Sequence, residues 1–469
     1  MPAMTMVRPG PYTAALTAYA AEFKYEQLTQ AAVSAAKTIV LDTLGALLLG
    51  SSRQYAASWL TGELARQMGG RQECTVIGRG FKTSCESAAL ANGTMGYAAD
   101  IEGGGAARQH VPAVLVPTAL VMAEREKADG RTLLAALALG YEVSCRVSEA
   151  CRTRQSYPHS FHPSAVFGYF GAATTAGHAL RLDRDQFANA LGLAGSNASG
   201  LMTWVTEPTE NSRPFVIGMA ARGGVTAALL AKMGFGGPPA VLDPGKYSIY
   251  DAYAGEMHLD RLLDGLGTDL WITRTGGFKR YPCCGDIHTG LDALLRLMDQ
   301  HRLDADDLIE VEHRVKADRF PVIDDNELKS HCAQYIMAVA AVNRKIGSDD
   351  ILVDRRVDPR IEAMCRRVKL VGDVEMDSWR AAAPAVVKLT TSDGQTFVKR
   401  VDWPKGHRKN PMSAGELEAK FLDLATTRIS RERAERLMGL VYHLETVDDA
   451  SRLTELLRCD EEPGEATNG

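Results

Sequence analysis

The pattern of hydrophobic and polar positions changes once along the chain, at about residue 275. Before it, apolar and small residues recur with a helical period, and the alternation typical of strands is rare. Three stretches, 130–151, 164–180 and 219–233, are apolar around most of their circumference, which is typical of helices buried among other helices. Further helices are predicted over 16–23, 28–49 and 56–68. The first part therefore predicts a helical bundle with a core rich in small residues.

After residue 275, apolar and polar residues begin to alternate with the period of two that is typical of strands. The sequence predicts a helix over 289–300 and strands over 308–315, 368–371, 386–391 and 395–401. Asp393-Gly394 between the last two strands is a hairpin signal. From Ser413 onward the helical period returns, with helices predicted over 414–424, 431–440 and 450–457.

The predicted fold class is mostly α with an α+β insertion. The helical domain has a first part over 1–275 and a C-terminal part over 408–469, and the smaller α+β domain occupies 276–407. Gly276-Gly277 and Pro404–Gly406 are the expected hinges at the two crossings. The polar tail from about residue 461 is expected to be disordered.

Composition narrows the class of protein. The 469 residues are 45% hydrophobic and 24% charged, and the net charge is −5, which argues against a nucleic-acid or anionic-membrane surface. Nine Cys without a CxxC pair favour reduced thiols over a disulfide framework. The N-terminus has no apolar signal region, and no uncharged apolar run reaches the roughly 18 residues of a membrane span. We expect a cytoplasmic protein with no nucleic-acid and no membrane partner.

Familiar cofactor motifs are missing. The sequence has no GxxxxGK[ST], GxGxxG, HExxH or GxSxG motif, and its Cys and His residues do not have the spacing of a structural zinc site. No cofactor or metal is therefore predicted.

Two polar residues flank one Gly-rich loop between apolar helices. Asp100 ends the stretch NGTMGYAAD, and His110 opens HVPAVLVPTALVMAE. A carboxylate beside a histidine fixes its tautomer and favours acid–base work. The alternative, a helix cap and a surface histidine, stays open at this point.

Further candidates lie ahead of other apolar helices. His162 precedes the helix at 164–180, where a helix N-terminus favours anions, and the neighbouring His159 could act in the same way. Arg213 and Lys279 could hold carboxylates, and His288 follows nine residues after Lys279. The alternative for each histidine is a satisfied structural residue, and for each cation a solvated one.

These segments, taken in order, resemble the MmgE/PrpD family. The resemblance rests on NGTMGYAADIEGGGAARQHVPAVLVP, FHPSAVFGYFGAATTAGHAL, RPFVIGMAARGGVTAALLAK, FKRYPCCGDIHTGLDAL and KGHRKNPMSAGELEAKF, and it covers nearly the whole chain. It implies a helical domain with an inserted α+β lid, a homodimer, and an active site that needs no metal or organic cofactor.

The resemblance also implies roles. Asp100, His110 and His162 would be catalytic, with Asp100 orienting or tuning His110, and Arg213, Lys279 and His288 would bind the substrate. Arg213 stands where many members have Lys, and Asp100-Ile101-Glu102 departs from the usual Asp-x-Asp-Asp.

The expected substrate is a small polycarboxylate. Dehydration of a 2-methylcitrate-like hydroxy acid is the first choice, decarboxylation of a cis-aconitate-like acid the second, and epimerisation of an iminodicarboxylate the third. All three need a proton to leave or join a carbon beside a carboxylate. A catalytically silent dimer is the alternative that is not an enzyme.

Overall fold

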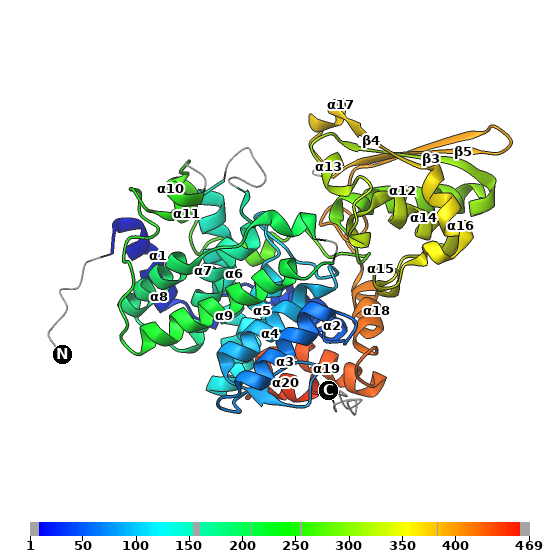
Figure 1. The fold of residues 1–469 in the computed structure, drawn as a ribbon. Coiled ribbons are helices and arrows are strands. Elements are labelled where there is room, and N and C mark those ends of the chain that lie inside the picture. Colours follow the sequence, from blue (N-terminus) through cyan, green and yellow to red (C-terminus); the bar gives the residue numbers. More distant parts are fainter. Residues whose placement is uncertain (1–8, 153–159, 208, 254–255, 382, 460–469) are drawn as a thin grey trace.

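The computed structural model describes residues 9–152, 160–207, 209–253, 256–381 and 383–459. His159 and the predicted disordered tail lie outside these ranges. Figure 1 shows two parts of unequal size, a larger helical part and a smaller α+β part that projects from one side of it. The predicted fold class, mostly α with an α+β insertion, is confirmed.

Six long helices form the centre of the helical part, and they pack closely because small residues face each other. Gly93 and Gly218 are so near that a Cβ on Gly93 would lie 2.9 Å from the Cα of Gly218. The six helices are α2 (Gln30–Gly50), α4 (Cys85–Ala98), α5 (Val111–Glu126), α6 (Gly130–Ala150), α7 (Pro163–Ala179) and α9 (Ser212–Lys232). The last begins seven residues before the predicted 219–233, so that Arg213 lies in its first turn.

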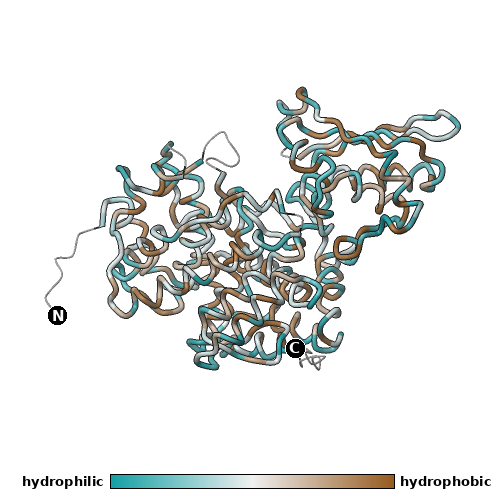
Figure 2. The backbone as a smooth tube through the Cα atoms, in the orientation of Figure 1, coloured by the Kyte–Doolittle hydropathy of each residue, from teal (hydrophilic) through white to brown (hydrophobic). Residues whose placement is uncertain are grey.

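Shorter elements cover this centre. They are α1 (Pro11–Glu22), α3 (Ala56–Met68), α8 (Arg184–Asn197), α10 (Ile249–Tyr253) and α11 (Leu259–Leu263), with a two-stranded hairpin of β1 (Cys74–Thr75) and β2 (Lys82–Thr83). The hydropathy pattern follows this layering, since hydrophobic stretches run through the middle of the helical part (Figure 2).

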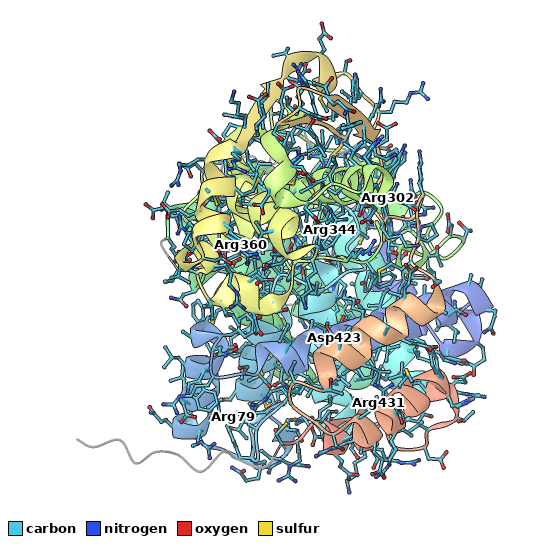
Figure 3. The ribbon with its side chains drawn as sticks, turned by 90° about the vertical axis from the view of Figure 1, so that its right-hand side faces the viewer. Arg79, Arg302, Arg344, Arg360, Asp423 and Arg431 are labelled. Carbon is cyan, nitrogen blue, oxygen red and sulfur yellow. The ribbon has the colours of Figure 1, made fainter. Side chains whose placement is uncertain are left out.

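The end of the chain returns to the helical part. Helices α18 (Ala414–Ala425), α19 (Arg431–Tyr442) and α20 (Ser451–Leu456) follow the α+β part in sequence. Phe421 of α18 and Leu437 of α19 belong to the same buried core as Ile39 and Leu44 of α2. From the side, Asp423 and Arg431 mark these helices, and Arg302, Arg344 and Arg360 mark the α+β part above them (Figure 3).

The α+β part has its own core and a four-stranded mixed sheet of order β4-β3-β5-β6. Strand β3 (Leu308–Lys316) pairs parallel with β4 (Val368–Asp373) and antiparallel with β5 (Ala385–Thr391), and β5 forms a hairpin with β6 (Thr396–Val401). Gly394 in that hairpin has φ +82°, as the Asp-Gly signal predicts. The helices of this part are α12 (Gly285–His301), α13 (Phe320–Ile323), α14 (Ala333–Asn343), α15 (Ser348–Leu352), α16 (Pro359–Arg367) and α17 (Val374–Asp377).

The two chain crossings between the parts lie side by side. The backbone amide of Phe278 donates to the carbonyl of Gly406 at 2.8 Å, and that of Arg408 donates to the carbonyl of Gly276 at 3.0 Å. The Gly-rich loop joins them, because Gly104 donates to the carbonyl of Gly277 at 2.6 Å. The predicted hinge segments therefore meet at one hydrogen-bonded junction beside the loop that carries His110.

Two helices, α2 and α9, are long and apolar enough to cross a membrane by length and composition. Both belong to the core, since 78% and 56% of their most apolar windows are buried inside the protein. Their apolar character is explained by packing within the bundle.

Candidate active site

A cavity of about 410 Å³ lies where the α+β part faces the helical part. Four helices point their N-termini toward it. His110 caps α5, His162 caps α7, Arg213 lies in the first turn of α9, and Gly285 begins α12. Each helix N-terminus carries a partial positive charge and unpaired backbone N–H groups, so this convergence favours anions. The described lining residues that carry polar side chains are Tyr97, Asp100, His110, Ser160, His162, Trp204, Arg213, Lys279, Cys284, Asp286, Arg319 and His331.

His110 is held by a buried carboxylate. Its Nδ1 lies 2.6 Å from Oε1 of Glu102, whose side chain is only 1% exposed. The backbone amide of His110 also donates to Oγ of Ser164 at 2.8 Å. With Nδ1 engaged by Glu102, Nε2 is the ring nitrogen left for a ligand, and it can accept or return a proton there.

A second imidazole lies beside the first. The rings of His110 and His162 are nearly parallel, at 21°, with centroids 6.5 Å apart. Burial, together with the neighbouring His110 and Arg213, holds the pKa of His162 well below its usual value. Its Nδ1 accepts from the backbone amide of Ala165 at 3.4 Å. His162 is therefore neutral near pH 7 and carries its proton on Nε2, which makes it a fixed hydrogen-bond donor.

Asp100 forms the centre of a buried charge cluster. Its Oδ1 lies 2.5 Å from Nζ of Lys279 and 2.9 Å from Nη2 of Arg213. Burial opposes the charge on Asp100, but Arg213 and Lys279 outweigh it, and the pKa of the carboxyl lies well below its usual value. Burial also opposes the charge on Lys279, but Asp100 and Glu102 raise the pKa of this ammonium. All three groups are thus ionised near neutral pH.

The Arg213 side chain is held by two carboxylates and two aromatic rings. Its guanidinium pairs with Glu210 as well as with Asp100, and it lies 4.5 Å from the ring centre of Tyr97 and 5.1 Å from that of Trp204. Such a flat, doubly paired and stacked position suits Arg better than Lys.

The α+β part supplies the opposite wall. Oγ of Ser330 donates to Oε2 of Glu210 at 3.1 Å, so a hydrogen bond joins the two parts beside the cavity. His331 lies against Trp204 with ring centroids 5.7 Å apart, and burial lowers the pKa of its imidazole to about 3. His331 is therefore a neutral group on the wall that Asp286 and Arg319 complete.

The described residues contain one group of side chains close enough to share a metal ion, Glu73, Cys85 and Glu86. It lies at the start of α4 and shares no residue with the cavity.

Comparison with known proteins places the chain in a family. The model of the MmgE/PrpD N-terminal domain matches residues 14–261, and that of the MmgE/PrpD C-terminal domain matches residues 281–446. The chain belongs to the MmgE/PrpD family. The family predicted from the sequence is thereby confirmed.

The relatives of this chain include proteins named for two different activities. The chain is 25% identical to cis-aconitate decarboxylase of Mus musculus, covering 93% of this chain and 91% of the relative, and 26% identical to that of Homo sapiens, covering 95% and 94%. It is 24% identical to 2-methylcitrate dehydratase of Cupriavidus necator, covering 62% of each chain.

The structure brings five of the six predicted MmgE/PrpD site residues to one cavity: Asp100, His110, His162, Arg213 and Lys279. His288 lies elsewhere. It is 3% exposed, its Nε2 lies 3.2 Å from the carbonyl of Cys283, and its ring packs against Tyr281. His288 does not line the cavity, so its role in substrate binding stays a prediction, and these contacts favour the satisfied structural histidine.

The orienting role predicted for Asp100 falls to another carboxylate. The carboxylate that orients His110 is Glu102, whereas Asp100 pairs with Arg213 and Lys279. The sequence held one signal for this, since Glu102 stands in the segment that departs from the family pattern. Glu210 and His331 were missed altogether, because nothing near them in sequence suggests that the two parts meet there.

Proposed function

We propose that this protein is a lyase that acts on a small tricarboxylate, with His110 transferring a proton at a carbon beside a carboxylate. One observation carries the proposal: the His110–Glu102 pair opens onto a cavity that also holds Arg213, Lys279 and four helix N-termini. A negative charge that develops on the substrate is stabilised there by fixed cations and dipoles. The precise pairing of charges also argues against a silent member that merely kept the fold.

Decarboxylation is the reaction that we favour. The cis-aconitate decarboxylases match this chain through both parts, with 93% and 95% of it covered, whereas the dehydratase of Cupriavidus necator matches 62%. This reverses the order given by the sequence alone.

The step balances without an oxidant. The bond between the methylene carbon of cis-aconitate and its carboxylate breaks, and CO₂ leaves. The released electron pair forms a new double bond, and the pair of the old double bond moves to the carbon beside the other terminal carboxylate. His110, protonated on Nε2 and held by Glu102, gives that carbon its proton, and the product is itaconate.

The second candidate is dehydration of a 2-methylcitrate-like hydroxy acid, favoured by the dehydratase relatives. Here neutral His110 takes a proton from the carbon beside a carboxylate, and the hydroxyl leaves as water with a proton from the Lys279 ammonium in the same cavity. His162 offers a hydrogen bond through Nε2–H, but its lowered pKa makes it a donor that polarises the hydroxyl rather than a strong acid.

The same proposal includes a homodimer in the cytoplasm. Apolar side chains are exposed along α3 and α9, with Leu60 63%, Leu64 42% and Met233 75% exposed, and a second copy could cover them. Light scattering after size exclusion tests this. Leu64→Glu should shift the mass to that of one chain, and an unchanged mass would move the interface elsewhere.

Proton NMR of the purified protein in deuterated water tests the reaction. The panel is cis-aconitate, 2-methylcitrate, citrate and iminodisuccinate. Itaconate that carries one deuterium supports decarboxylation, and a new alkene from a hydroxy acid supports dehydration. Deuterium uptake without net product would mean epimerisation. His110→Asn should abolish whichever signal appears, and full turnover by that variant would remove His110 from the mechanism.

A further inference from the structure

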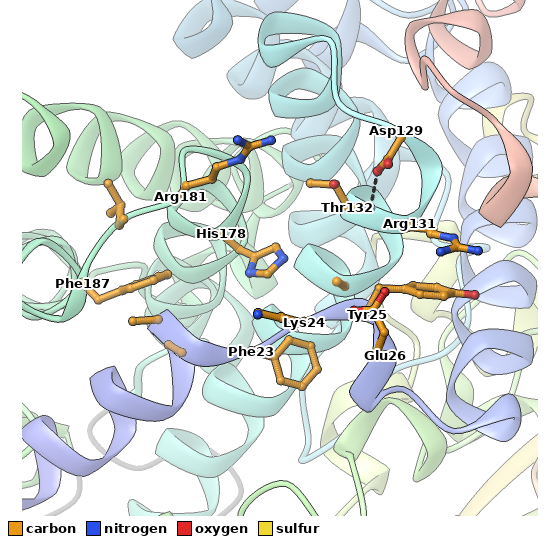
Figure 4. Close-up of a pocket in the computed structure, with 14 residues that line it drawn as sticks. Phe23, Lys24, Tyr25, Glu26, Asp129, Arg131, Thr132, His178, Arg181 and Phe187 are labelled. Carbon is orange, nitrogen blue, oxygen red and sulfur yellow. Dashed lines mark hydrogen bonds between the residues drawn. The ribbon is translucent and has the colours of Figure 1, made fainter.

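A second cavity, of about 430 Å³, lies in the helical part at a place that shares no residue with the candidate active site. It lies between the segment that links α1 to α2, the start of α6, and the end of α7. Figure 4 shows charged and aromatic side chains around one open space. Its volume falls within the range of roughly 300–1,000 Å³ that is typical of small-molecule sites.

Cations outnumber carboxylates among the side chains that line this cavity. Lys24, Arg131 and Arg181 line it. Among the residues that the structure describes, neither the Lys24 ammonium nor the Arg181 guanidinium has an ion-pair or hydrogen-bond partner. Arg131 lies 5.1 Å from the ring centre of Tyr25 and donates to the carbonyl of Glu445 at 3.3 Å. Three positively charged side chains around one cavity can bind an anion that has more than one charged group.

The acidic residues of the wall do not offset these cations fully. Asp129 caps α6, since its Oδ1 accepts from the backbone amide of Thr132 at 2.8 Å. Glu26, the other carboxylate that lines the cavity, is exposed. The capping leaves Asp129 with less capacity to bind the nearby cations.

A neutral imidazole completes the cavity. The ring of His178 packs edge-on against Phe23, with centroids 6.2 Å apart, and burial lowers its pKa to about 4. In the described part of the chain its ring nitrogens have no hydrogen-bond partner. Figure 4 shows His178 and Lys24 reaching the same space. His178 is half-buried and lines the cavity, so its ring can form a hydrogen bond with a ligand there.

The place of the cavity links it to the active site. Helix α7 begins at the His162 cap and has His178 in its last turn. Helix α6 begins at the Asp129 cap, and near its other end Ser144 bonds to Gln109, next to His110, at 2.8 Å. Helix α7 carries His162 and helix α6 contacts the residue next to His110, and each of these helices has one end at the second cavity.

We propose that this cavity, defined by Lys24, Arg131, His178 and Arg181, binds a small organic polyanion and thereby adjusts turnover through α6 and α7. The recognised chemistry is two or more carboxylate or phosphate groups on a compact ligand. The proposal stands apart from the choice of reaction, since it needs only a measurable turnover and a binding signal.

Isothermal titration calorimetry distinguishes a ligand with phosphate groups from one with carboxylate groups. The probes are pyrophosphate and tricarballylate, an unreactive tricarboxylate. The test variant is Lys24→Ala/Arg181→Ala, whose side chains are exposed, so the fold should survive. The control is Arg184→Ala, a nearby exposed arginine paired with Glu22 that does not line the cavity.

For at least one probe, wild type should show a binding event that the double variant weakens by about tenfold or more and the control leaves unchanged. The probe that responds identifies phosphate or carboxylate as the recognised group. The same probe should change the turnover number of wild type at saturating substrate but not that of the double variant. Equal affinities in all three proteins for both probes would overturn the site, and binding without any change in turnover would overturn the coupling.

Discussion

Glu102→Gln tests the central feature of the proposed mechanism. The change keeps the size of the side chain and removes its charge. His110 Nδ1 lies 2.6 Å from Glu102 Oε1, so the two charge centres of the protonated pair are about 4 Å apart. At the effective dielectric of about 20 that suits such pairs, their attraction is about 4 kcal/mol. The His110 side chain is 33% exposed, and solvent screening should reduce the figure to about 2 kcal/mol.

That attraction holds Nδ1 of His110 against Glu102 and so directs Nε2 toward the cavity when His110 donates a proton. Losing about 2 kcal/mol should lower kcat about 30-fold. KM should change little, because Glu102 does not line the cavity. The assay is the initial rate of product formation, followed by NMR, over a range of substrate concentrations. Glu256→Gln is the matched control, since Glu256 faces His258 at 3.9 Å on the surface. Its kcat should equal that of wild type.

Non-additivity separates a positioning role from a merely structural one. If Glu102 acts through His110, the variant Glu102→Gln/His110→Gln should be no slower than His110→Gln alone. A wild-type kcat in Glu102→Gln would refute the reasoning, and so would a double variant slower by the product of the two single effects.

Three further predictions concern binding and stability. Arg213→Lys should raise KM for the tricarboxylate about tenfold, because Lys cannot pair with Asp100 and Glu210 and also stack on the aromatic rings of Tyr97 and Trp204. Initial rates measure this, and an unchanged KM would contradict it. His313 is fully buried, with a pKa lowered to about 4 by burial and both ring nitrogens without a hydrogen bond in the described structure. Because the unfolded chain takes up a proton on this histidine that the folded protein excludes, the free energy of unfolding falls as pH drops from about 6.5 toward 4. His313→Leu removes this loss, so the variant should gain about 2 kcal/mol more over wild type at pH 5 than at pH 8. Denaturant unfolding of both proteins at both pH values measures this difference. Gly406→Ala should lower Tm, because Gly406 has φ +98° and its new Cβ would lie 2.0 Å from a carbonyl oxygen. The control Gly439→Ala, in a helix with open space around it, should raise Tm slightly. Equal Tm shifts of the two variants in differential scanning calorimetry would contradict a special role of Gly406 at the junction.

The long helices were predictable because periodicity reports burial directly. The predicted helix over 56–68 coincides with α3, and the apolar stretch 130–151 becomes α6 with one residue less. The strand order was beyond the sequence. Strand β3 pairs parallel with β4 across a long helical crossover, and alternation within each strand carries no information about its neighbours. The start of α9 was placed seven residues too late, because Arg213 and Pro214 do not continue the run of small apolar residues that marks the rest of that helix.

The candidate site was predictable where the chemistry is local and hidden where it depends on tertiary contacts. Asp100 and His110 flank one loop, so their convergence followed from the chain itself. Which carboxylate reaches Nδ1 depends on the path of that loop. Asp100 takes a left-handed conformation, with φ 49°, and Glu102 is then the residue that meets the ring. Glu210 and Ser330 are separated by 120 positions, and only the contact between the two parts of the fold brings them together.

The charge of the resting cavity bears on why a tricarboxylate suits it. Asp100 and Glu210 already face Arg213 and Lys279, so these four groups nearly cancel. A ligand carboxylate that reaches the two cations must share them with Asp100, whose Oδ2 is buried without a hydrogen bond in the described structure. The remaining attraction comes from the N-termini of α5 and α7, whose first turns carry no acidic residue, whereas α12 has Asp286 in its first turn. These partial positive charges lie at different places around a cavity of about 410 Å³ and favour a ligand whose negative charges are also distributed. A compact acid with three carboxylates meets that condition better than an acid with a single charge.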